Sequence, residues 1–117
     1  IEADNAELYN EWAKFHLGLR NWDRAIELLS LGLAANPADA QLCNNRGVAH
    51  AQKEEHAEAV IWYRRALEAS PDYVRAYSNL GDALQASGNL SGARQAFNEA
   101  LRREPRNSRA LNALRKM

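Results

Sequence analysis

The chain has 117 residues, of which 46% are apolar and 26% charged, a composition typical of one folded domain rather than a disordered segment. Fifteen Lys and Arg balance fifteen Asp and Glu, which argues against nucleic acid as the partner, because phosphate recognition normally requires a basic surface. No apolar run approaches the roughly 20 residues that span a bilayer, and the opening IEADN lacks the features of a signal peptide, so we expect no membrane insertion and a cytoplasmic location.

Three prolines divide the chain into equal units. Pro37, Pro71 and Pro105 are its only prolines and stand 34 residues apart. Equal spacing of a helix-breaking residue indicates an internal repeat. We therefore expect a single domain, 1–117, made of the repeats 6–39, 40–73 and 74–107, followed by a capping or truncated helix over 108–117.

Each repeat predicts two helices. In the third, an apolar stripe at helical spacing begins at Tyr77, Ser87-Gly88-Asn89 interrupts it, and a second stripe runs from Ala93 until Pro105 ends it. Small residues occur at the same places in every repeat, so the two helices can pack closely: these are Ala13, Gly47 and Gly81, then Ala25, Ala59 and Ala93, then Gly32, Ala66 and Ala100. Asn5, Asp39 and Asn107 stand at the junctions before 6–39, 40–73 and 108–117 and are predicted helix caps.

Some positions depart from this pattern. Glu54 stands where the third repeat has Gly88 in its turn, and a left-handed conformation there would cost about 1 kcal/mol. Arg46 replaces the apolar Leu80, and we expect its stem to lie on apolar surface while its guanidinium reaches water or an acid. Trp12 falls on an apolar stripe and is predicted to lie in the core, whereas Trp62 lies one residue off its stripe and is a candidate for an exposed contact.

The repeat resembles the tetratricopeptide repeat, whose pattern of large, small and proline positions is matched by Tyr77, Leu80, Gly81, Ala93, Phe97 and Pro105. The resemblance covers nearly the whole chain. It implies an all-α fold, a right-handed α-α superhelix of antiparallel helix hairpins whose first helices line a concave groove. It also implies a module that binds other proteins.

No catalytic or metal-binding motif emerges from the sequence. His16, His50 and the single cysteine, Cys43, are residue types that bind zinc, but stacked helices about 8 to 10 Å apart do not bring three ligands within the 2.0 to 2.3 Å that zinc requires. A nucleophile motif, a phosphate-binding loop and a Cys-x-x-Cys pair are all missing from the sequence. We therefore expect a protein that is not an enzyme and needs no cofactor.

The face of the first helices opposite their apolar stripe is the predicted binding surface. Asparagine recurs on it at repeat spacing, and a column of carboxamides can pair with the alternating N–H and C=O groups of an extended peptide. The alternative is that these polar residues are simply solvated. The candidate peptide-binding residues are Asn10, Lys14, Gln41, Asn44, Asn45, Val48, Arg75, Ser78, Asn79 and Asp82.

Five of these positions correspond to the carboxylate clamp of chaperone-binding family members, which consists of Lys, Asn, Asn, Lys and Arg. The residues here are Asn10, Lys14, Asn45, Arg75 and Asn79, so the order is altered and the last Arg is Asn. This departure argues against recognition of a chaperone tail. The favoured function is a scaffold or adaptor that binds an extended segment of a protein partner in the groove.

The second hypothesis is structural assembly. Residues 1–58 carry ten acids and five bases, and residues 59–117 carry five acids and ten bases, so the halves have net charges of −5 and +5. The acidic end of one chain could dock on the basic end of the next, giving a head-to-tail homo-oligomer.

Overall fold

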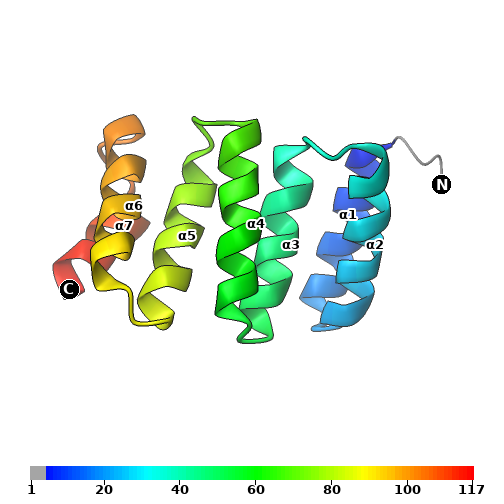
Figure 1. The fold of residues 1–117 in the computed structure, drawn as a ribbon, viewed down its shortest axis with the longest axis horizontal. Coiled ribbons are helices and arrows are strands. Elements are labelled where there is room, and N and C mark those ends of the chain that lie inside the picture. The colour runs from blue at the N-terminus through cyan, green and yellow to red at the C-terminus, as the bar shows by residue number, and fades with distance from the viewer. Residues whose placement is uncertain (1–4) are drawn as a thin grey trace.

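The computed structural model describes residues 5–117, which form seven helices and no strand. The helices follow one another as three antiparallel hairpins and a final helix, stacked along the long axis of a body of 43 × 25 × 20 Å (Figure 1). This arrangement confirms the predicted all-α superhelix. No helix within the described range is both long and apolar enough to cross a membrane. The helices are α1 (Ala6–Gly18), α2 (Trp22–Ala35), α3 (Ala40–Gln52), α4 (His56–Ala69), α5 (Val74–Ala86), α6 (Leu90–Arg103) and α7 (Ser108–Lys116).

Short polar side chains start three of the four odd-numbered helices. The side-chain oxygens of Asn5, Asp39 and Asn107 accept hydrogen bonds from the backbone N–H groups three residues later, at 2.9 to 3.0 Å. These contacts satisfy amide donors that have no partner within the helix. The three predicted caps are confirmed. Helix α5 differs, because Tyr73 occupies its cap position and makes no capping hydrogen bond through its side chain.

The turn within each hairpin contains one residue with left-handed backbone geometry. Gly88 has φ of +89°, and the equivalent residues Glu54 and Arg20 have φ of +63° and +62°. Glycine adopts this region freely, whereas a residue with a Cβ does so at a cost. The left-handed conformation expected at Glu54 is confirmed, and Arg20 adopts the same conformation.

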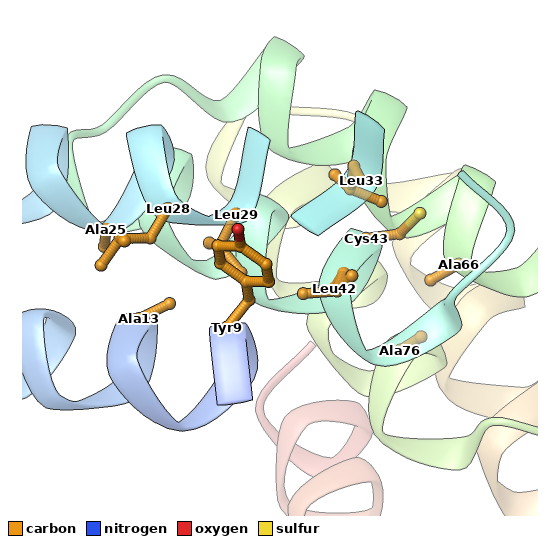
Figure 2. Close-up of a cluster of buried hydrophobic side chains, with 10 residues drawn as sticks. All are labelled: Tyr9, Ala13, Ala25, Leu28, Leu29, Leu33, Leu42, Cys43, Ala66 and Ala76. Carbon is orange, nitrogen blue, oxygen red and sulfur yellow. The ribbon is translucent and has the colours of Figure 1, made fainter. Parts of the chain in front are cut away.

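Close helix packing explains the recurring small residues. A Cβ added at Gly47 would lie 2.5 Å from the ring of Tyr63, and one added at Gly81 would lie 2.7 Å from the ring of Phe97. Each of these two glycines therefore lets an aromatic ring of the second helix lie directly on its backbone. The first and second hairpins enclose a continuous apolar cluster that includes Tyr9, Leu29 and Leu42, and side chains from both hairpins point into it (Figure 2).

The prediction that Trp12 lies in the core is wrong, because α1 lies at the end of the stack and 45% of this residue is exposed. The guanidinium of Arg46 lies over the ring of Trp62, 4.2 Å from the centroid, and burial lowers its pKa. The guanidinium of Arg65 also lies against this ring, at 4.5 Å. Trp62 is thus half-buried among cations and does not present a free stacking surface.

Candidate peptide-binding groove

The first helices of the three hairpins form a hollowed face. Helix α3 lies between α1 and α5 and contacts both. One hollow of about 510 Å³ opens over α1, α3 and α5, and a second of about 540 Å³ continues from it towards α7. The two hollows share Gln41, Tyr73 and Arg75. They are two parts of a single groove that crosses the stack.

Five of the predicted residues line the first hollow, and all of them are polar: Asn10, Lys14, Gln41, Asn45 and Arg75. Among the described residues Arg75 has no ion-pair partner, and its side chain is exposed. The ammonium group of Lys14 lies 3.2 Å from the carboxylate of Glu11, and both side chains are more than half exposed. Such exposed pairs contribute little energy and exchange partners easily. Arg75 is therefore a groove cation without an ion-pair partner, in hollows that Glu7, Glu11, Asp39, Asp72 and Glu104 also line.

The phenol of Tyr73 lies between the two halves of the groove. Burial raises the pKa of this side chain above its usual value, and the nearby cation Arg75 opposes that effect only in part. Its hydroxyl is therefore protonated at neutral pH and can donate a hydrogen bond to a ligand. A donor beside Arg75 suits an acceptor such as a carboxylate.

The asparagines bind one another rather than standing free. The amide nitrogen of Asn45 donates to the side-chain oxygen of Asn10 at 2.7 Å, and Asn79 donates to Asn44 in the same way at 3.0 Å. Each bond joins neighbouring repeats across 35 residues of sequence. The amide of Asn10 also lies 3.5 Å from the oxygen of Gln41. Carboxamides at these positions therefore hold adjacent first helices together.

This network changes the interpretation of the predicted column of carboxamides. Asn44 and Ser78 are each 1% exposed, so both are buried, although Ser78 borders the second hollow. The reason is geometric, because residues at this repeat position point into the contact between successive first helices. Asn10, at the same position, is 4% exposed. Among the predicted asparagines, only Asn45 combines partial exposure with a place in the first hollow.

Helix α7 contributes a groove residue that the sequence reasoning missed. Arg109 donates to the side-chain oxygen of Asn79 at 2.7 Å and forms an ion pair with Asp82. Asn79 and Asp82 therefore anchor α7 against α5 in this conformation. Arg109 stands 34 residues after Arg75, and this repeat spacing was the signal that could have identified it.

Val48 and Asp82 belong to a third hollow. This hollow of about 340 Å³ also includes Tyr63 and Arg109, and its lining is more apolar than that of the other two. Val48 lies within the face, half-buried, as the sequence pattern suggested. It gives this part of the groove a surface suited to an apolar side chain.

The comparisons with known proteins agree with this architecture. Two family descriptions, both named tetratricopeptide repeat, match residues 4–74 and 49–117. The chain belongs to the tetratricopeptide-repeat family. RNA polymerase II-associated protein 3 of Xenopus laevis is 34% identical over all 117 residues, and the sti1 homologue of Schizosaccharomyces pombe is 27% identical over 82% of the chain. The chain spans only 18% and 16% of the lengths of these relatives.

Two similar solved structures contain peptides. The first TPR of Spaghetti (RPAP3), bound to the HSP90 peptide SRMEEVD, superposes with a TM-score of 0.93 at 28% identity and covers 99% of this chain and 92% of that one. The second TPR domain of human RPAP3, in complex with the HSP70 peptide SGPTIEEVD, gives 0.88 at 30% identity, covering 92% and 90%. Family and fold class are thereby confirmed.

Proposed function

We propose that this domain is a non-catalytic adaptor that holds an extended, acidic peptide segment of a protein partner in its concave groove. The observation that carries the proposal is Arg75, an exposed cation without an ion-pair partner at the junction of two hollows that together cross the stack. A peptide carboxylate placed there gains a charge-assisted hydrogen bond, which is stronger than one between neutral groups.

Neighbouring groups support an anionic ligand at this point. The Tyr73 hydroxyl is a donor at neutral pH, and Lys14 can leave its exposed partner Glu11 to face a second carboxylate. Asn45 donates one amide proton to Asn10, so its second proton and its oxygen can serve the peptide backbone. These contacts recognise an extended chain with acidic groups rather than one particular sequence.

The similar structures that hold SRMEEVD and SGPTIEEVD favour the same ligand class. They also weaken the argument that the altered clamp positions exclude a ligand of this kind. Lys14 and Asn10 have exchanged residue types relative to the clamp, but both line one hollow, so a cation and an amide are still present there. At the last clamp position Asn79 is occupied by Arg109, which brings a guanidinium to that part of the groove from α7.

The comparisons give no support to the head-to-tail alternative. The basic groups expected to receive the acidic end include Arg103 and Arg109, and these are already engaged within the chain by Glu99, Asp72 and Asp82. Head-to-tail assembly stays a prediction from the charge asymmetry alone.

Titration of a fluorescein-labelled SRMEEVD peptide, followed by anisotropy at low ionic strength, tests the proposal. We expect Arg75→Ala to weaken binding at least tenfold, because loss of one charged hydrogen-bond partner costs about 1.5 to 3 kcal/mol. Arg94→Ala is the matched control, since this exposed arginine lies on α6 outside the groove, and it should change the affinity less than twofold.

A second arm separates acidic recognition from general charge attraction. The peptide SRMQQVN with an amidated C-terminus keeps the length of the ligand but removes its carboxylates, and we expect its binding to the wild-type protein to be at least tenfold weaker. Equal affinity of the wild-type protein and Arg75→Ala for SRMEEVD would refute the assignment of Arg75. Equal affinity for both peptides would refute an acidic ligand.

A further inference from the structure

Helix α1 has an exposed apolar stripe that the groove does not use. Leu8, Trp12, Phe15 and Leu19 are 40%, 45%, 61% and 61% exposed. Their spacing of four, three and four residues places them on one side of the helix. At 100° per residue, Asn10 falls on the opposite side, towards the groove. The first hairpin lies at the end of the stack (Figure 1), and the exposure of these four side chains places the stripe on a face that no described helix covers.

The position of Leu8 is covered in every later first helix and in α7. Leu42, Ala76 and Ala110 stand 34, 68 and 102 residues after Leu8, and each is fully buried. Leu42 packs in one cluster with Leu28, Leu29 and Leu33 of the preceding helix α2. The face exposed on α1 is thus the face that packs against a neighbouring helix elsewhere in the molecule. Apolar patches of this kind on a protein surface mark interaction sites.

The size of Phe15 indicates what kind of partner can cover the stripe. Its equivalents in α3 and α5 are Ala49 and Ala83, which are 0% and 3% exposed because the preceding hairpin packs close to them. A phenyl ring at this position does not fit beneath a hairpin at the same distance. Trp12 is likewise larger than Leu80, its equivalent in α5, whereas α3 has Arg46 at this position. The stripe suits a helix at a larger separation that supplies large side chains of its own.

The spacing of the stripe is palindromic, and this property favours a second copy of the same chain. We propose that two copies pair through antiparallel α1 helices around a two-fold axis. Leu8 of each copy then opposes Leu19 of the other, and Trp12 opposes Phe15, so the large rings meet at the centre. An isologous contact requires this kind of self-complementarity, and aromatic side chains are enriched at such interfaces.

The charged residues of α1 do not take part in this pairing. Glu11 and Lys14 pair with each other and line the first hollow of the groove. The proposed two-fold axis lies midway between Ala13 and Lys14 along the helix. Because the contact is isologous, assembly stops at the dimer, in contrast to a head-to-tail chain that continues to grow.

Sedimentation equilibrium over protein concentrations up to about 1 mM tests the dimer. We expect the mass to rise from 13.1 kDa to twice this value and then to remain constant. Phe15→Glu should raise the dimer dissociation constant at least tenfold. Leu31→Glu is the matched control, because Leu31 is 51% exposed on α2, and it should change the constant less than twofold. Circular dichroism confirms that both variants are folded.

Disulfide trapping tests the orientation independently. In a Cys43→Ala background, a mixture of Leu8→Cys and Leu19→Cys chains should cross-link to the mixed dimer, whereas either chain alone should cross-link at least tenfold less. A wild-type chain that remains monomeric throughout the concentration range overturns the proposal and leaves the stripe to a helix of another protein. Growth beyond the dimer, or efficient cross-linking of Leu8→Cys to itself, overturns the antiparallel pairing.

Discussion

The second hairpin, α3–α4, and the third, α5–α6, have helices of the same lengths but different residues at their caps and turns. Helix α3 starts with the capping carboxylate of Asp39, whereas α5 starts at Tyr73 without a side-chain cap. The turn of the second hairpin places Glu54 at φ +63°, whereas the third uses Gly88 at φ +89°. Each hairpin is therefore favourable at one local site and unfavourable at the other.

What the two hairpins keep in common is the contact between their helices. A glycine of the first helix lies under an aromatic ring of the second in both, as Gly47 under Tyr63 and Gly81 under Phe97. We infer that this close contact determines the hairpin geometry and that the turn residue adopts the conformation the contact requires. The predictions below test that order of importance.

The largest effect should come from filling the close contact. Gly47→Ala and Gly81→Ala place a Cβ at 2.5 and 2.7 Å from ring carbons, so the helices must separate, at a cost of about 2 to 3 kcal/mol of unfolding free energy. Urea denaturation measures this change. Gly18→Ala is the control, because nothing lies within 4 Å of the added Cβ. If all three variants lose the same stability, the glycines serve chain flexibility and not packing.

A smaller effect should follow from exchanging the turn residues. Gly88→Glu introduces left-handed strain into the third hairpin and should destabilise it by about 1 kcal/mol, while Glu54→Gly should relieve strain in the second by a similar or smaller amount. The double variant should restore a stability near that of the wild type, since the sites lie in different hairpins. Two changes of the same sign would contradict the strain that the φ angles imply.

The repeat could be predicted from the sequence because its determinants are local and periodic. Proline spacing, small residues and polar caps each act within one hairpin. Depth of burial could not be predicted as well, because it depends on the neighbouring hairpin. Asn44 and Ser78 lie on the expected face of their helices, yet the contact with the adjacent first helix buries them. Trp12, by contrast, was expected in the core and is exposed, because no hairpin in the described structure covers α1.

The groove was only partly predictable for a similar reason. Lys14, Asn45 and Arg75 follow from the helical face on which they stand, and the hollow confirms that they lie together. Arg109 comes from α7 and reaches back to Asn79 and Asp82, a contact between segments about 30 residues apart. Periodicity identifies which face a residue occupies, but the direction of a long side chain depends on partners in the folded molecule.

The smallest predicted effect concerns the aromatic ring of the second hairpin and appears only at alkaline pH. Tyr63 is 3% exposed, and its burial raises its pKa well above the usual value, whereas Phe97 of the third hairpin does not titrate. The unfolded chain ionises this tyrosine near pH 10 while the folded chain does not. The stability that the protonated Tyr63 hydroxyl contributes is therefore complete below about pH 10 and is lost as the pH rises towards the pKa of the folded state.

Tyr63→Phe makes the second hairpin resemble the third in this respect. We expect the wild-type protein to lose about 1 kcal/mol more unfolding free energy than the variant between pH 9 and pH 11, measured by urea denaturation at each pH. Other titrating groups, including Tyr73, are present in both proteins and cancel in the difference. Parallel pH profiles would show that water reaches the Tyr63 hydroxyl from the third hollow, and would mean that the ring above Gly47 is less tightly enclosed than its contact distance implies.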